Sequence, residues 1–277
     1  MRILKNIPEL NQEVSNNLNK ITVEKDGHIL LIGLNRAEKL NAFDVEMYID
    51  LAKAYGELHT DKDLRCGLLF AHGKSFTAGL ELDKWASAFS GGSFPELPEG
   101  AVDPLGIDED NRLAKPMIMA AKGICFTIGL ELMMATDIRV AAEGTRFGQI
   151  EVKRGIYPVG GATMRFFEEI GWSNAMLYLL TGDELSVEDA YRLRMIQKVT
   201  EPGKEFDTAL EIAKRVAKQA PLAVQAALKA SRRARANGPK EAVKHLLPEL
   251  QPLMNSEDVL EGLQSFLERR EANFKGK

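Results

Sequence analysis

Two glutamates lie in sequence surroundings that suit acid–base chemistry. The first, Glu131, is expected in the first turn of a helix that is otherwise apolar, with Leu130, Leu132, Met133 and Met134 around it. A carboxyl group buried among such side chains has a raised pKa and can exchange protons near neutral pH. The position also suits an exposed acid stabilised by the positive end of the helix dipole, and both interpretations stay open here.

The second acid, Glu151, precedes a loop that contains Gly155, Pro158, Gly160 and Gly161. Such a loop offers free backbone N–H groups, and loops held by a rigid scaffold often carry functional residues. In isolation, the simpler interpretation is a solvated acid beside the Lys and Arg that follow it.

Residues 73–82 form a small-residue turn that follows an apolar strand and opens a helix. A turn of this kind directs free backbone N–H groups into one spot, which suits an oxyanion or a phosphate. Taken alone, the segment is more typical of a tight structural corner between a strand and a helix.

Short strands and helices alternate around these segments. Asp26-Gly27 is a dipeptide typical of two-residue hairpin turns, in which both central residues need positive φ, and Asp44 suits a helix N-cap. In chain order, the expected strands and helices lie at residues 21–25, 28–34, 44–58, 67–71, 116–121, 128–135 and 138–142. Strands interleaved with helices predict an α/β fold.

Residues 86–110 differ from their surroundings because glycines, prolines and acids are frequent there. This composition favours a loop or partial disorder over packed structure, so we expect a mobile flap or an insertion. Beyond Ser186, which opens a helix with a capping signature, the chain is expected to be helical at 206–220, 221–236 and 256–274. The last helix carries an apolar stripe that needs a partner surface, formed by Val259, Leu260, Leu263, Phe266 and Leu267.

The segments around Gly79, Glu131 and Glu151, in this order, resemble the crotonase superfamily, also called the enoyl-CoA hydratase and isomerase family. Residues 34–43 look like its first loop that contacts coenzyme A, and residues 181–190 resemble its TG…A stretch. The resemblance runs from about Ile21 to the C-terminus. It divides the chain into an N-terminal extension (1–20), a core (21–200) with a variable insertion near 86–110, and a C-terminal helical region (201–277).

The resemblance implies a crotonase-type spiral core of ββα units and a C-terminal helical oligomerisation region that packs into homotrimers, often paired as hexamers. It places an oxyanion hole at the backbone N–H groups of Leu80 and Ile128, the water-activating base at Glu131, and the group that exchanges the α-proton at Glu151. It further implies substrate and coenzyme A contacts at Arg36, Ala37, Lys39, Ala78, Gly79 and Gly129. The expected activity is 2-enoyl-CoA hydratase, with a double-bond isomerase that relies on Glu151 as the alternative. A non-catalytic scaffold or RNA-binding relative is the alternative from another class.

Three positions depart from the family pattern. Many members have three glycines where this chain has Thr127-Ile128-Gly129, so the Ile128 side chain is expected to narrow the acyl pocket. Glu81 stands where Asp is usual. Val159 occupies the position of a second acid in dienoyl-CoA isomerases, which argues against that subfamily.

Composition excludes several other classes of function. The formal net charge of −4 and the pI near 5.7 provide no general positive field for nucleic acid or an anionic membrane. The N-terminal residues lack the apolar run of a signal peptide, and Cys66 and Cys125 lie in apolar runs typical of reduced thiols, so a cytoplasmic protein is expected. No histidine has metal-ligand spacing, so we expect no metal and no cofactor other than the coenzyme A carried by the substrate.

Overall fold

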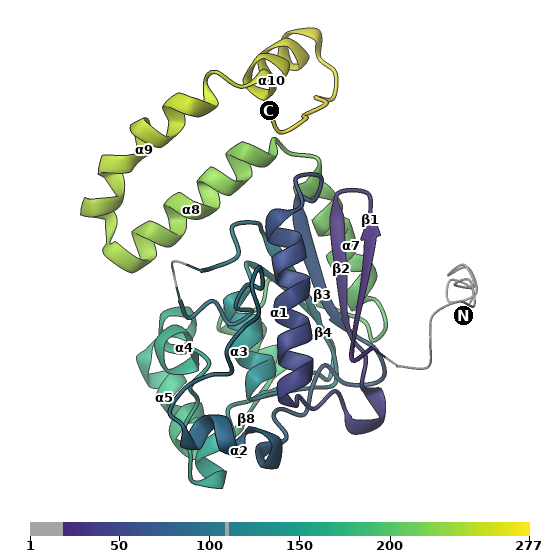
Figure 1. The fold of residues 1–277 in the computed structure, drawn as a ribbon, viewed down its shortest axis with the longest axis vertical. Helices are drawn as coiled ribbons and strands as arrows, with labels where there is room; N and C mark the ends of the chain where they lie inside the picture. Colours follow the sequence, from purple (N-terminus) through teal and green to yellow (C-terminus); the bar gives the residue numbers. More distant parts are fainter. Residues whose placement is uncertain (1–18, 109–110) are drawn as a thin grey trace.

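The chain is described at residues 19–108 and 111–277 in a computed structural model, so residues 1–18 of the expected N-terminal extension lie outside the described part. A six-stranded sheet in the order β1-β2-β3-β4-β6-β9 forms the centre of the fold (Figure 1). Its first two strands pair antiparallel and all later neighbours pair parallel. These strands span Ile21–Asp26, Ile29–Leu34, Cys66–Ala71, Met117–Ala121, Ile138–Ala142 and Lys198–Thr200.

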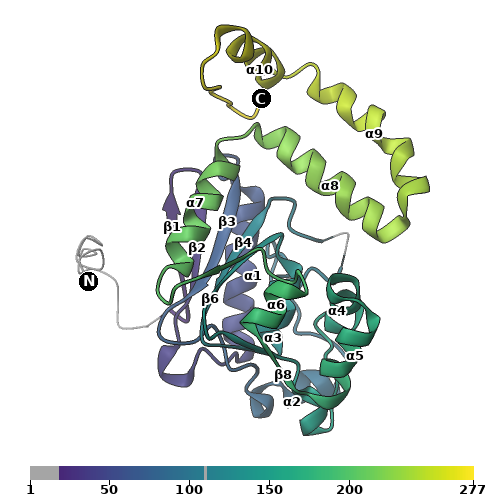
Figure 2. The same cartoon turned by 180° about the vertical axis from the view of Figure 1, so that it is seen from behind.

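Helices cover both faces of this sheet, which explains why its parallel strands are almost continuously apolar. Helix α1 (Val45–Thr60) lies on one face in Figure 1, and α7 (Glu205–Ala217) lies on the other in Figure 2. Successive residues of a strand point to opposite faces. Leu69 accordingly belongs to the apolar cluster on the α1 side, whereas Leu68 packs with the residues of α7.

The predicted hairpin is present, but its turn is shifted by one residue. Asp26 still pairs with Ile29, so Gly27 and His28 form the turn and only Gly27 has positive φ, at 58°. The prediction that Asp26 and Gly27 are the central pair is therefore wrong. A glycine at the first central position is what a type II′ turn prefers, and the register of the two strands decides between the alternatives.

The other predicted strands and the helices at 44–58 and 128–135 are confirmed within a few residues. The N-cap of α1 is Asp44, whose carboxylate accepts a hydrogen bond from the Met47 N–H at 2.9 Å. A second, three-stranded sheet and several short helices lie beside the main sheet. They comprise β5 (Ile124–Phe126), β7 (Arg146–Gly148), β8 (Glu184–Ser186), η1 (Ala37–Lys39), α2 (Leu82–Ser90), α3 (Ile128–Ala135), η2 (Glu151–Arg154), α4 (Ala162–Ile170), α5 (Trp172–Thr181) and α6 (Val187–Arg192).

Beyond α2 the described part of the segment 86–110 is a loop, as predicted, and most of residues 91–100 are exposed. Residues 101–105 are packed, however, which a mobile flap does not predict. The first residues of the segment complete α2, and Val102 and Leu105 are buried. Asp103 fixes the irregular stretch, because its carboxylate accepts hydrogen bonds from the Tyr48 hydroxyl at 2.8 Å and from the Leu105 N–H at 2.9 Å. Glycine and proline exclude regular secondary structure there, but they do not exclude burial.

The C-terminal helices α8 (Pro221–Asn237), α9 (Pro239–Leu253) and α10 (Glu257–Glu268) project from the body (Figures 1 and 2). Sequence analysis missed α9, because Pro248 and Pro252 look like helix breakers. It also extended the last helix too far, since Arg269 ends it in the left-handed conformation.

Arginines of α8 hold this helix both to the body and to α9. Arg232 pairs with Asp137 at 3.0 Å, and Arg233 pairs with Glu249 of α9 at 2.7 Å. No helix in the described residues is both long and apolar enough to cross a bilayer.

Candidate active site

Glu131 is buried in the first turn of α3, with 5% of its surface exposed. Burial, with a smaller contribution from the charge of Glu151, raises the pKa of Glu131 to about 8, against the lowering effect of backbone hydrogen bonds. One of these bonds comes from the Ala162 N–H at the start of α4, 3.1 Å from the Glu131 Oε1 atom. The interpretation of Glu131 as an exposed helix-terminal acid is therefore excluded.

Gly160 allows the backbone to approach this carboxyl group closely. A Cβ atom added at Gly160 would lie 2.3 Å from the Glu131 Oε2 atom, so any side chain there would force the Glu131 carboxyl group to move. Sequence analysis noted Gly160 only as part of a loop. Its particular role depends on a contact between residues far apart in the chain, which no local pattern indicates.

Glu151 is the first residue of η2 and is also buried, with 8% exposed. Burial raises the pKa of its carboxyl group to about 7. Its Oε2 atom has no hydrogen-bond partner among the described residues. A solvated acid beside Lys153 and Arg154 is thus excluded, and two interacting carboxyl groups that titrate near neutral pH lie in one region.

The loops that carry Leu80 and Ile128 run side by side in the same direction. Thr77 forms a parallel bridge with Cys125, in which the Thr77 N–H donates to the Ile124 carbonyl at 2.9 Å. Leu80 and Ile128 each lie three residues beyond this bridge, so they occupy equivalent places in the two loops. Within the described part of the chain, neither of their N–H groups donates a hydrogen bond.

Gly79 and Gly129 let these loops approach each other. Gly79 has φ 113°, and a Cβ atom there would lie 2.3 Å from the Thr127 Oγ1 atom. A Cβ atom at Gly129 would lie 2.4 Å from the Thr77 Cγ2 atom. The two free N–H groups are thereby held in tight surroundings, as preorganised donors to an anionic oxygen must be.

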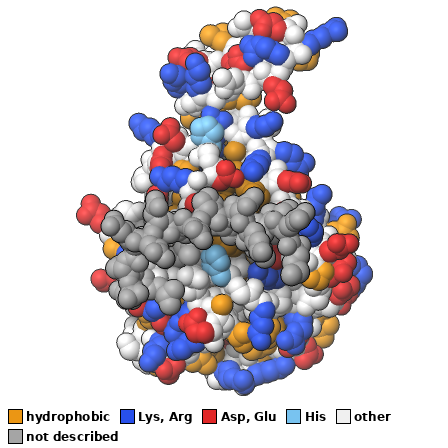
Figure 3. Space-filling view, turned by 90° about the vertical axis from the view of Figure 1, so that its right-hand side faces the viewer, with side chains coloured by type: hydrophobic (Ala, Val, Ile, Leu, Met, Phe, Trp, Pro, Cys, Tyr) orange, Lys and Arg blue, Asp and Glu red, His pale blue; other side chains and the backbone are white. Residues whose placement is uncertain are grey.

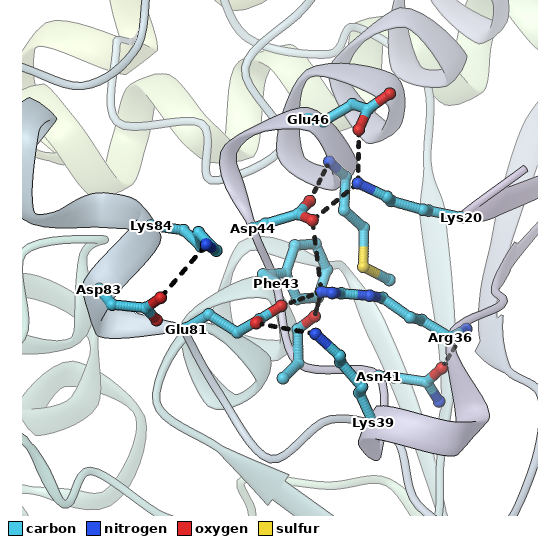
Figure 4. Close-up of polar contacts among 12 residues, drawn as sticks. Lys20, Arg36, Lys39, Asn41, Phe43, Asp44, Glu46, Glu81, Asp83 and Lys84 are labelled. Carbon is cyan, nitrogen blue, oxygen red and sulfur yellow. Dashed lines mark hydrogen bonds and ion pairs between the residues drawn. The ribbon is translucent and has the colours of Figure 1, made fainter.

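Two of the residues matched to coenzyme A contacts, Arg36 and Lys39, take part in an ion-pair cluster with Glu81 (Figure 4). Arg36 is 9% exposed; its guanidinium group pairs with Glu81 and lies 3.4 Å from the Asp44 carboxylate. Lys39 is more exposed, with its Nζ atom 3.3 Å from a Glu81 oxygen. Ala37 is exposed, and Ala78 is half-buried.

This cluster gives Glu81 a role that sequence analysis missed. The side chain that replaces the usual Asp is the main partner of Arg36, and 45 residues separate the two in the chain. Lys39 therefore supplies the more accessible positive charge of this loop.

The family model for enoyl-CoA hydratase/isomerase matches residues 24–277. The chain belongs to this family. The enoyl-CoA hydratase EchA19 of Mycobacterium tuberculosis is 34% identical over 258 residues, covering 92% of this chain and 96% of that protein. Carnitinyl-CoA dehydratase of Salmonella enteritidis is 33% identical over 259 residues, covering 91% and 97% of the two chains.

A solved structure supports the same enoyl-CoA hydratase/isomerase assignment. It is a probable enoyl-CoA hydratase/isomerase from Mycobacterium abscessus that is 43% identical, with a TM-score of 0.90 over 94% of this chain and 100% of that chain. The expected crotonase-type α/β fold with a helical C-terminal region is confirmed.

Proposed function

We propose that this protein hydrates 2-enoyl-CoA thioesters, with Glu131 and Glu151 as its acid–base pair. The observation that carries the proposal is the combination of two buried, interacting carboxyl groups with two backbone N–H groups that lack an internal acceptor. Relatives that are named enoyl-CoA hydratases and are 30% to 34% identical to this chain support the same reaction class.

The reaction passes through an enolate, whose negative oxygen develops as water adds to the β-carbon. The N–H groups of Leu80 and Ile128 are placed to donate to that oxygen, and losing one such donor costs about 3 kcal/mol. Glu131 takes a proton from the attacking water, and Glu151 delivers a proton to the α-carbon. The pair begins and ends with one proton in total: Glu151 has given its proton to the α-carbon, and Glu131 holds the proton taken from water. Proton exchange with solvent then restores the starting state.

Hydrogen bonding favours this starting arrangement. The Ala162 N–H donates to Glu131 and stabilises its charged form, whereas the Glu151 Oε2 atom has no partner and suits a protonated acid. Burial acts in the other direction, because it leaves Glu131 with the higher pKa, about 8 against about 7 for Glu151. The proton that the pair shares at neutral pH must therefore move from Glu131 to Glu151 before water attacks.

Two alternative functions are separated by particular residues. A double-bond isomerase needs only one group to move a proton, which leaves the buried and hydrogen-bonded Glu131 without a role. An RNA-binding protein is disfavoured by the net charge of −4 and by the interspersed acidic and basic side chains on the face in Figure 3. A non-catalytic scaffold leaves the two buried carboxyl groups without a role.

We further propose that the functional unit is a homotrimer or a pair of trimers. Helices α9 and α10 expose large apolar side chains, including Leu247 and Phe266. Exposed apolar surface of this extent is typical of an interface.

The test is a turnover screen across short, medium, branched and aromatic 2-enoyl-CoA thioesters, each paired with its 3-enoyl isomer. Hydratase activity appears as loss of the conjugated enoyl absorbance together with a 3-hydroxyacyl-CoA product. Conversion of 3-enoyl to 2-enoyl thioester without hydration would instead establish the isomerase. Failure with every thioester, in a protein shown to be folded, would contradict both.

A further inference from the structure

Thr127 holds the backbone next to Ile128 in a conformation that L-amino acids rarely adopt. Its φ of 50° and ψ of −116° are those of the first central residue of a type II′ turn, a position dominated by glycine. A β-branched side chain makes this conformation still less favourable. The Thr127 hydroxyl adds no compensation, because its Oγ1 atom is buried and has no partner among the described residues.

Hydrogen bonds to the peptide groups of Thr127 oppose this strain. The Thr127 N–H donates to the Gly148 carbonyl at 2.7 Å, and the Thr127 carbonyl accepts from the Glu131 N–H at 3.1 Å. The same carbonyl also accepts from the Gln149 Nε2 atom at 3.3 Å. Gln149 is therefore the side chain that holds this carbonyl from outside its own helix.

Gln149 is fully buried between β7 and η2, two residues before Glu151. Its Oε1 atom has no partner among the described residues. The hydrogen bond to the Thr127 carbonyl is therefore what offsets the cost of burying this amide. Leaving a buried acceptor unpaired is unfavourable, and polar groups that persist in such a state are typical of functional sites.

The bonds that the Thr127 carbonyl accepts from Glu131 and Gln149 together fix the direction in which the Ile128 N–H points. A trans peptide is planar, so its C=O and N–H groups point in opposite directions. Any relaxation of Thr127 rotates the plane that carries the Ile128 N–H. Because the carbonyl is held toward Gln149 and α3, the N–H points in the opposite direction within the peptide plane.

We propose that Gln149 is a positioning residue, which keeps the Ile128 N–H aimed into the oxyanion hole against the backbone strain at Thr127. The role of the Ile128 N–H as an oxyanion donor rests on the proposed function. The structural coupling between Gln149 and Thr127 is independent of that function. The coupling predicts that Gln149 matters because residue 127 has a side chain, and that it matters much less when glycine removes the strain.

The test is a double-mutant cycle with Gln149→Met, made in the original chain and in the Thr127→Gly background. In the original chain we expect turnover to fall by roughly 10- to 100-fold, mostly in kcat with KM little changed, since the donor is misaimed but not deleted. In the Thr127→Gly background the same substitution should cost at most about threefold. Equal losses in both backgrounds, or no loss in either, would overturn the proposal.

Thr136→Val is the matched control, because it removes another buried side-chain hydrogen bond to a backbone carbonyl, the 2.7 Å bond to Met133 at the far end of α3. It should leave kcat unchanged. Gln149→Asn provides a second variant should Gln149→Met not fold, since it keeps the amide but shortens its reach, and the same background-dependent loss is expected.

A measurement without substrate separates this inference from the proposed function. Crystal structures of Gln149→Met in the two backgrounds should show the peptide between residues 127 and 128 rotated in the original chain and unchanged with Thr127→Gly. This comparison decides the inference even if the protein turns over no enoyl-CoA thioester, a result that would sink the proposed function alone. An unrotated peptide in both backgrounds would overturn the inference while leaving hydration intact.

Discussion

The site on α3 and the helices α9 and α10 both depart from the usual distribution of polar and apolar side chains, in opposite directions. Around Glu131 and Glu151, ionisable groups lie inside the protein. On the projecting helices, large apolar side chains lie outside it, and Phe266 and Leu267 are 79% and 72% exposed. Polar groups are normally kept in water and apolar groups away from it.

The two regions differ in what completes them. Backbone donors such as the Ala162 N–H reach Glu131 from within the chain, so the site is assembled in one copy of the protein. The apolar face of α10 has no corresponding cover among the described residues. A buried charge thus indicates chemistry in the first region, and an uncovered apolar face indicates a partner in the second.

The sharpest way to break this comparison is to remove the ionisable groups from the site. Glu131→Gln and Glu151→Gln keep the shape of the side chain but cannot exchange a proton. We expect each to lower hydration by roughly 10²- to 10⁴-fold, measured as kcat on the best 2-enoyl-CoA thioester. Circular dichroism should show an unchanged fold. Losses below about tenfold in both variants would refute the assignment, and a severe loss in Glu151→Gln alone would favour the isomerase.

A backbone substitution tests whether the site also depends on a donor without a side chain. Ile128 is the first residue of α3, where proline is tolerated, so Ile128→Pro deletes the N–H at an acceptable position. Turnover should fall by roughly 10²- to 10³-fold. Ile128→Val is the control, because it keeps the donor and most of the buried volume. Normal turnover by a folded Ile128→Pro protein would show that the oxyanion hole lies elsewhere.

On the projecting helices, the corresponding change adds charge where the structure exposes apolar surface. Leu263→Glu combined with Phe266→Glu should dissociate the proposed trimer or hexamer at micromolar concentration, as sedimentation velocity would show. Val23→Glu is a matched control, since Val23 is also exposed but lies on β1. A monomeric original protein would contradict the proposed assembly.

The smallest expected effect concerns stability and its dependence on pH. A glutamate with a raised pKa binds its proton more tightly when folded, so it destabilises the protein increasingly as pH rises from its ordinary value of 4.5 toward about 8. Glu131→Gln has no charge to bury. Its Tm should therefore decline less than that of the original protein between about pH 5 and pH 9, by several degrees in differential scanning calorimetry. Parallel declines would show that Glu131 is not buried in its charged form.

Much of the site could be anticipated from sequence, because its chemistry is local. Glu131 lies three residues beyond Ile128, the first residue of α3, and its apolar neighbours indicated burial as one of two interpretations. The N-cap of α1 was likewise predicted from Asp44 and the residues that follow it. Gln149 and Gly160 could not be anticipated in this way, since their roles depend on contacts across the fold. Burial of residues 101–105 was missed for a similar reason, because Asp103 finds its donor on α1.

The Arg36–Glu81 ion pair has a consequence for the natural history of this sequence. Both side chains are largely buried, so replacing one alone would leave the other with a single more distant partner, Asp44 for Arg36 or Lys39 for Glu81. The two positions should therefore change together among relatives, with a shorter acid accompanied by a shift of the arginine or by its loss. An alignment in which they vary independently would show that the loop tolerates the unpaired charge by opening to water.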